Sequence, residues 1–210
     1  MNMMRFTTMK TKLRKYPSIF LILLLAISSC FLTGCVNQHQ RQQKSSQGES
    51  VETMLEITDP KEKQAVLNAK AKVKALSGNP RIVATSPAVA DICDKLDLDL
   101  VGVPKSSVSK IPSRYKKVKK VGLAMSPDME IVSSLNPDWI LAPSSLETDL
   151  KPKFEELKNT EYAFLNLRSV QGMYRSVQEL GEIFGKQQEA EKMTKEFTTF
   201  YKSYTKRNKN

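Results

Sequence analysis

Short apolar runs of β-type residues alternate with helical patterns from Arg81 onward, and this alternation limits the possible folds more than any other feature of the sequence. The apolar runs cover residues 81–85, 100–103, 138–142 and 162–166. Between them, one helical face carries Val89, Ile92 and Leu96, and another carries Met129, Val132 and Leu135. Strands and helices that alternate at this spacing indicate a parallel sheet covered on both faces. The sequence therefore predicts an α/β domain after residue 80, where the chain is long enough for one domain of about 100 to 150 residues.

Amphipathic helices are predicted on both sides of this α/β part. From Pro60 to Leu76 apolar residues recur every three or four positions, and Gly78 and Pro80 end the pattern. Two more apolar stripes follow the last predicted strand, one before Gly185 and one after it. The last stripe ends in a polar, basic sequence with no further apolar segment to pack against it.

The start of the chain has the organisation of an export signal. Residues 1–16 carry five basic side chains and no acidic one, and the apolar run Ile19–Leu32 follows. This run is shorter than the ~20 residues that a spanning helix needs. It ends at Leu32–Cys35, which resembles the lipobox read by bacterial signal peptidase II. We therefore expect cleavage before Cys35, lipidation of Cys35, and anchoring on the outer face of the bacterial cytoplasmic membrane.

Charge and cysteine content limit the partners of the mature chain. Removal of residues 1–34 lowers the formal net charge from +11 to +6, because five positive charges and no negative ones are lost. A charge of this size suits an anionic lipid surface or an anionic ligand and does not by itself indicate nucleic acid.

Of the three cysteines, Cys30 is lost with the signal peptide and Cys35 takes the lipid, so Cys93 has no partner for an intramolecular disulfide. Residues 36–50 contain a single large apolar side chain and are predicted to form a flexible tether.

Several motifs from Arg81 to the end resemble one family of exported proteins. They are Arg81–Ser86, Leu96–Pro104, Arg114–Lys116, Val121–Val132 and Leu135–Asp138. Their order and spacing resemble the amino-terminal lobe of the metal-chelate-binding lipoproteins of ABC importers, a class III solute-binding protein fold. Within that class the likeness is greatest to the haem receptors of the iron-regulated surface determinant system. The resemblance implies iron acquisition through an ABC permease, with haem b delivered by a cell-surface donor protein.

Members of this family have two α/β lobes joined by one long helix, with the ligand clamped between the lobes. The resemblance therefore divides the chain into a signal peptide (1–34), a lipid anchor with its tether (35–59), an amino-terminal lobe with a preceding helix (60–184) and the start of the inter-lobe helix (185–210). The carboxy-terminal lobe is absent from the sequence, and we expect either a truncated gene product or a fragment.

Met125 is the first candidate for a ligand contact. The haem receptors supply one axial ligand of the iron from a methionine that follows a glycine in this loop, and Gly122–Met125 matches that place. A thioether is a soft, neutral donor that suits haem iron. In the family the second axial ligand is a histidine of the carboxy-terminal lobe. The only histidine of this chain is His39, which lies in the tether and is expected to be solvated.

The remaining candidates are placed by the same resemblance. Thr85 and Ser86 end a strand where a helix begins, a place at which backbone N–H groups attract anions, and in the haem receptors this turn helps to hold the propionates. Capping of the helix is the structural alternative. Lys105, Ser106 and Ser107 follow the second strand and are predicted to contact the other propionate. Glu130 opens a helix at the position from which related receptors offer a glutamate to the permease, although an acidic residue is favourable there in any case.

An enzyme is difficult to build from these residues. A single tether histidine excludes a conventional serine or cysteine triad, and the sequence has no glycine-rich phosphate loop. The basic run between Lys110 and Lys120 lacks the interleaved aromatic residues of a nucleic-acid groove and is expected to be a solvated surface. Two alternatives to haem import stay open: a receptor for a ferric siderophore or cobalamin, and a surface lipoprotein or inactive remnant that transports nothing.

Overall fold

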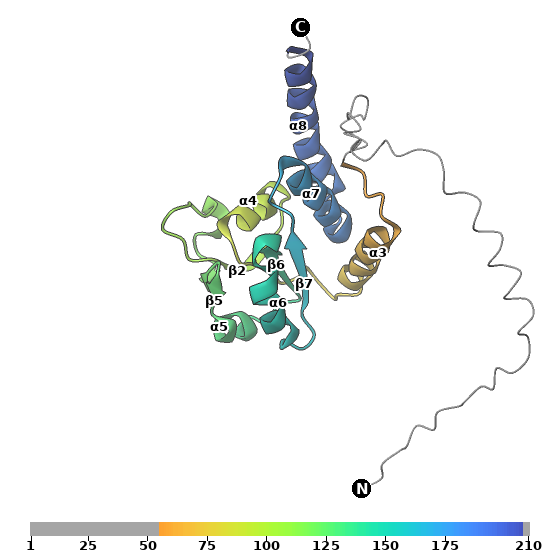
Figure 1. Cartoon of the computed structure of the whole chain (residues 1–210). Helices are drawn as coiled ribbons and strands as arrows, with labels where there is room; N and C mark the ends of the chain where they lie inside the picture. The colour runs from red at the N-terminus through yellow and green to blue at the C-terminus, as the bar shows by residue number, and fades with distance from the viewer. Residues whose placement is uncertain (1–54, 208–210) are drawn as a thin grey trace, which may run out of the picture. The chain divides into compact units, whose positions relative to one another are not determined.

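A computed structural model describes residues 55–207, which contain a five-stranded parallel sheet (Figure 1). The signal peptide, Cys35 and His39 lie outside the described residues. The sheet has the strand order β3-β2-β1-β6-β7, and its strands are β1 (Ile82–Ala84), β2 (Leu100–Val103), β3 (Lys119–Lys120), β6 (Trp139–Pro143) and β7 (Glu161–Leu165). All four neighbouring pairs of strands are parallel. The predicted parallel α/β fold is confirmed.

Helices cover both faces of this sheet because successive strand residues point to opposite sides. Ile82 and Ala84 of β1 lie in one apolar cluster, whereas Val83 between them lies in the other. The first cluster includes residues of α3 (Pro60–Lys74), α4 (Pro87–Lys95) and α7 (Val170–Phe184). The second includes residues of α5 (Met129–Ser134) and α6 (Glu147–Glu155). The result is a three-layer lobe whose buried strands are apolar on both faces, as the sequence predicts.

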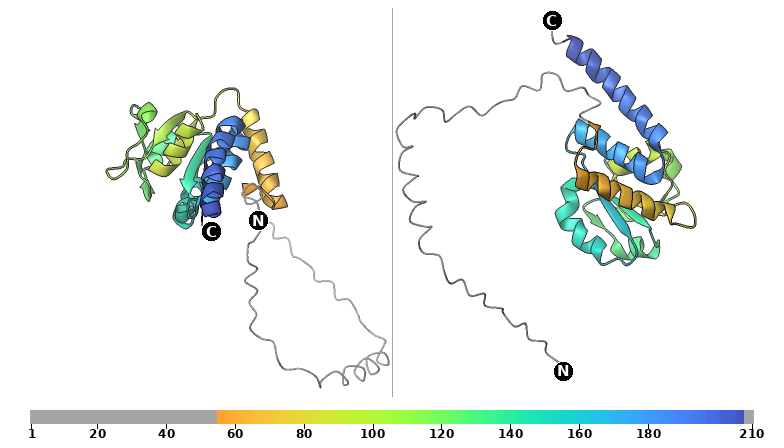
Figure 2. Two further views of the ribbon diagram at one scale, coloured as in Figure 1. Left: turned by 90° about the horizontal axis from the view of Figure 1, so that it is seen from above. Right: turned by 90° about the vertical axis from the view of Figure 1, so that its right-hand side faces the viewer.

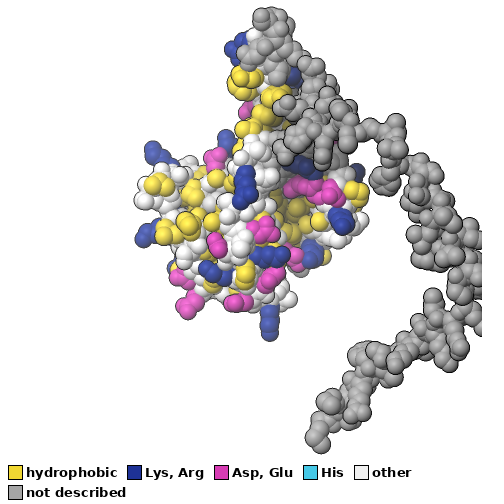
Figure 3. Space-filling model, viewed as in Figure 1, with side chains coloured by type: hydrophobic (Ala, Val, Ile, Leu, Met, Phe, Trp, Pro, Cys, Tyr) yellow, Lys and Arg dark blue, Asp and Glu magenta, His cyan; other side chains and the backbone are white. Residues whose placement is uncertain are grey.

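Helix α8 (Gln187–Arg207) turns back along α7, and both views in Figure 2 place these two helices with α3 on one side of the sheet. Gly185 ends α7 in the left-handed conformation, with φ of 71°. A Cβ added to Gly181 would lie 2.6 Å from the Cβ of Ala190, so the two helices are in close contact there. The far end of α8 extends past α7, and Figure 3 shows hydrophobic side chains along it, where Phe200 and Tyr204 are more than half exposed. Within residues 55–207 no helix is both long enough and apolar enough to cross a membrane.

Helix α3 is attached to α7 partly through two half-buried glutamates, Glu62 and Glu179. Arg175 of α7 donates a hydrogen bond to Glu62 of α3, and Glu179 of α7 lies beside Glu62. Burial, and then the neighbouring Glu62 carboxyl, raise the pKa of Glu179 to about 7, although Arg175 opposes the shift. The folded protein therefore holds a proton on Glu179 at a pH where the unfolded chain has released it.

We expect the free energy of unfolding to fall as the pH rises through about 7, since the stabilisation by this raised pKa is complete only below the ordinary glutamate range. The fall should be roughly 1 kcal/mol or less, because the carboxyl is partly solvated. Glu179→Gln should remove this pH dependence, whereas the exposed Glu191→Gln should keep it. Urea denaturation between pH 5.5 and 8.5 measures the difference, and identical pH profiles for all three proteins would contradict the assignment.

Candidate functional site

The candidate site lies where β1, β2 and β3 reach their carboxyl ends. In the strand order β3-β2-β1-β6-β7, the chain moves outward from β1 in one direction and, after β6, in the other. Open α/β sheets bind ligands outside the carboxyl ends of their strands, near such a reversal. The predicted contact residues of the lobe all follow β1, β2 or β3. The fold therefore brings these sequence segments to one edge of the sheet.

At the end of β1, Thr85 and Ser86 support the turn into α4. Thr85 is fully buried, its N–H donates to the carbonyl of Leu141 at 3.0 Å, and its hydroxyl is 3.4 Å from the same oxygen. The Ser86 hydroxyl caps α4 by accepting a hydrogen bond from the N–H of Val89. In this arrangement both hydroxyls are engaged with the protein, and Thr85 is not accessible to a ligand. The capping alternative therefore describes Ser86, whereas the Thr85 side chain is bonded to strand β6.

The loop after β2 is open to solvent. Lys105 and Ser107 are exposed, whereas Ser106 is half-buried and accepts a hydrogen bond from the N–H of Ser109. Val108 at the tip of this loop is 95% exposed. The backbone N–H of Lys105 donates to the carbonyl of Gly122 at 2.7 Å, which ties this loop to the next one.

Met125 lies at the tip of a small antiparallel hairpin formed by β4 (Gly122–Leu123) and β5 (Ser126–Pro127). Its side chain is 73% exposed, and Leu123 on the same hairpin is 58% exposed. Gly122 begins the hairpin at φ of 94°, a conformation that favours glycine. A thioether at an exposed tip is accessible to a ligand from outside, whereas a core methionine is not.

Glu130 is exposed in the first turn of α5. Asp128 caps this helix: one of its carboxylate oxygens accepts hydrogen bonds from the N–H groups of Glu130 and Ile131 at 3.1 and 3.0 Å. The cap is therefore supplied by Asp128, and the Glu130 carboxylate is available on the surface.

The basic run between β2 and β3 contains one structural residue that the sequence analysis missed. Arg114 donates to Asp97 and Asp99, both at 2.8 Å, and its guanidinium lies 5.3 Å from the ring centre of Tyr115. The hydroxyl of Tyr115 donates to the carbonyl of Leu98 at 2.5 Å. Because the acidic partners lie 15 and 17 residues earlier, the run of basic letters gives no sign of them.

Arg114→Ala should lower the free energy of unfolding by about 1 kcal/mol, since it removes two charged hydrogen bonds and the contact with Tyr115. Lys117→Ala, an exposed position in the same run, should change it little. Urea denaturation measures both variants. Equal stability of the two would show that Arg114 is only a solvated charge.

The described part of the chain offers neither a reactive thiolate nor a cluster of metal-binding side chains to these residues. Burial raises the pKa of the Cys93 thiol to about 12, which leaves it without a reactive thiolate. Among residues 55–207 no group of three or more His, Cys, Asp or Glu side chains is placed to hold a metal ion.

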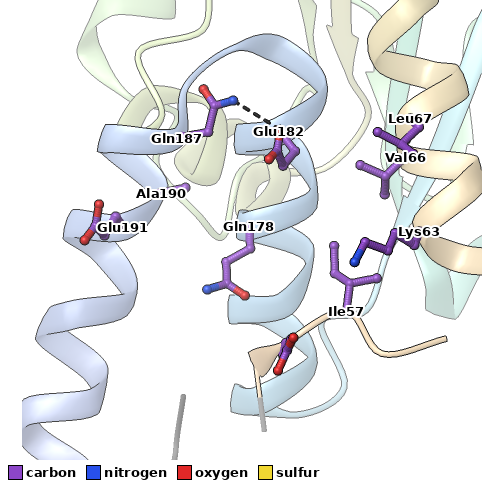
Figure 4. A pocket seen from close by; sticks show the side chains of 10 residues that line it. Ile57, Lys63, Val66, Leu67, Gln178, Glu182, Gln187, Ala190 and Glu191 are labelled. Atoms are coloured by element: carbon purple, nitrogen blue, oxygen red, sulfur yellow. Dashed lines mark hydrogen bonds between the residues drawn. The ribbon is translucent and has the colours of Figure 1, made fainter. Parts of the chain in front are cut away.

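A separate pocket of about 600 Å³ lies away from this edge, between α3, α7 and α8 (Figure 4). Its apolar lining comes from Ile57, Val66, Leu67 and Ala190. None of the predicted contact residues lines it.

Comparison with known proteins shows which protein family has this architecture. Residues 82–210 match the sequence profile of the family described as "Periplasmic binding protein". The chain belongs to this family. It is 36% identical over 117 residues to the High-affinity heme uptake system protein IsdE of Staphylococcus aureus strain Newman, which is 56% of this chain and 39% of IsdE. The chain thus spans well under half the length of this family member.

Solved structures of proteins in this family are similar to this lobe. An ABC transporter substrate-binding protein from Listeria monocytogenes EGD-e is 44% identical, with a TM-score of 0.56, over 58% of this chain and 46% of that one. S. aureus IsdE complexed with heme is 34% identical, with a TM-score of 0.54 and the same coverage. The siderophore-binding protein BauB is 25% identical, with a TM-score of 0.50, over 58% of this chain and 45% of that one. The resemblance inferred from the sequence motifs is confirmed for the family, and relatives that bind haem and relatives that bind siderophores both share the lobe.

Proposed function

We propose that this chain is a membrane-anchored haem-binding receptor of an ABC importer for iron acquisition. One observation carries the proposal: the exposed thioether of Met125 lies at the tip of a hairpin beside the carboxyl ends of the strands. The identity with IsdE, whose name refers to heme uptake, supports haem as the ligand. Met125 then ligates the iron, and the exposed Lys105 and Ser107, with the half-buried Ser106, face the anionic propionates.

Thr85 and Ser86, at the end of β1, have a different role from the residues that contact the ligand. Because the Thr85 and Ser86 hydroxyls are already engaged, they act by fixing the turn into α4 beside the ligand. A direct contact from either hydroxyl requires that its present hydrogen bond is broken.

The competing proposal within the family is a ferric siderophore receptor, which the likeness to BauB favours. Such ligands carry their own iron donors and need no axial methionine. Titration of the full chain in detergent with haem and with ferric siderophores, followed by absorption spectroscopy, separates the two. We expect a saturable change in the haem spectrum and none with siderophore. The reverse result would replace haem by a siderophore, and no binding to either would favour a lipoprotein without a transport role.

Permease docking is assigned to Glu130, on the exposed first turn of α5. Glu130→Ala should leave haem binding unchanged and weaken association with the importer about tenfold, because the carboxylate offered to the permease is lost. Co-purification with the permease measures association, and Glu156→Ala, an exposed glutamate just after α6, is the matched control. Unchanged association of the Glu130 variant would reduce Glu130 to a favourable charge at a helix start.

A further inference from the structure

Asp128 lies between the hairpin that carries Met125 and the helix that carries Glu130, and it is hydrogen-bonded to both. The N–H of Asp128 donates to the carbonyl of Val121 at 2.8 Å and so closes the base of the hairpin. Its side chain caps α5. Backbone and side chain of a single residue therefore hold both elements, which lie next to each other in Figure 1.

The hairpin has a fixed base and an exposed tip. Its base is held by the hydrogen bond from Lys105 to Gly122 and by the pairing of Gly122 with Pro127. Gly122 approaches Asp128 closely, since a Cβ added there would lie 2.8 Å from the Asp128 nitrogen. A ligand that contacts the tip acts on a segment whose other end is Asp128.

Helix α5 depends on this connection because it is short. It has only six residues, and isolated helices of that length are unstable in water. Its stability comes from the Asp128 cap and from packing of the buried Val132 on the sheet. Glu130 lies in the first turn, between the cap and Val132.

We infer that ligand contact at the hairpin tip stabilises the first turn of α5 through Asp128, so that Glu130 is held more firmly when the receptor is loaded. The inference rests on the proposed function and adds a regulation to it. A ligand that orders the tip reduces opening of the hairpin base, and the cap opens less often because it is the same residue. A permease that binds Glu130 thereby favours the loaded receptor over the empty one.

Amide hydrogen exchange of the full chain in detergent, with and without haem, tests the relay. We expect exchange in residues 128–134 to slow about threefold on haem addition, and exchange in α6 on the same face of the sheet to stay unchanged. Bound haem without slower exchange in residues 128–134, or with equal slowing in α6, overturns the inference while leaving haem binding intact. Absence of haem binding overturns the proposed function, and the relay with it.

Two variants locate the connection. Asp128→Ala removes the carboxylate that caps α5 and keeps the backbone N–H that closes the hairpin, so haem should still bind while the haem-dependent slowing in residues 128–134 is lost. Asp149→Ala, in the first turn of α6, is the matched control and should keep the slowing. Gly122→Ala should also uncouple the two elements, because its Cβ displaces Asp128. Continued burial of Cys93, measured as resistance to alkylation, shows that each variant is folded. Full slowing in Asp128→Ala excludes the Asp128 side chain as the connection.

Discussion

Met125→Leu is expected to remove most of the specific haem binding, with a loss of affinity of at least about tenfold, or about 1.4 kcal/mol. Leucine keeps the apolar volume at the hairpin tip and removes the sulfur, so the variant isolates coordination from contact. The only histidine of the sequence is His39, so no imidazole within residues 55–207 can replace the Met125 thioether as a ligand. Titration followed by the absorption spectrum of the bound haem measures the effect.

Three controls define this result. Leu123→Ala removes another exposed apolar side chain from the same hairpin and should weaken binding far less. His39→Ala should have almost no effect. Imidazole added to the wild type should occupy the open coordination position and change the spectrum. Saturable haem binding of equal strength in the wild type and in Met125→Leu would show that the iron has no ligand from Met125.

Cys35→Ala is expected to abolish lipidation and to release or mislocalise the protein, because the thiol is the acceptor of the diacylglycerol in a lipobox. Metabolic labelling with a radioactive fatty acid, followed by fractionation of membranes, measures both effects. Cys30→Ala, five residues earlier in the apolar run, should still be labelled. Label that persists in Cys35→Ala would show that another residue carries the lipid, or that none of this processing occurs.

The regular part of the lobe could be predicted because burial on both faces of a parallel sheet leaves a readable pattern. The four apolar runs correspond to β1, β2, β6 and β7 within one residue at each end. By contrast, β3, β4 and β5 have two residues each, too few for any period to appear. Helix α6 was also missed, since it contains Pro152 and buries only two side chains.

The position of the candidate site at the edge of the sheet could be predicted from the sequence, but the contacts of its individual side chains could not. The order of strands and helices puts Thr85, Lys105 and Met125 at one edge of the sheet. Whether a hydroxyl at that edge is open depends on which backbone oxygen lies opposite, and for Thr85 that oxygen belongs to Leu141, 56 residues later. Long-range partners of this kind, like those of Arg114, have no local signature in the sequence.

Gly181 of α7 is in close contact with Ala190, near the first residues of α8. This contact is the pivot about which the rest of α8 can tilt. Helix α8 has 21 residues and is therefore about 30 Å long. A methyl group at position 181 would meet Ala190 at 2.6 Å and force the two helices apart there. A tilt of about 10° at this pivot displaces the far end of a 30 Å helix by about 5 Å. The small residues Gly181 and Ala190 thus set the angle between α7 and α8, and with it the direction in which the exposed Phe200 and Tyr204 point.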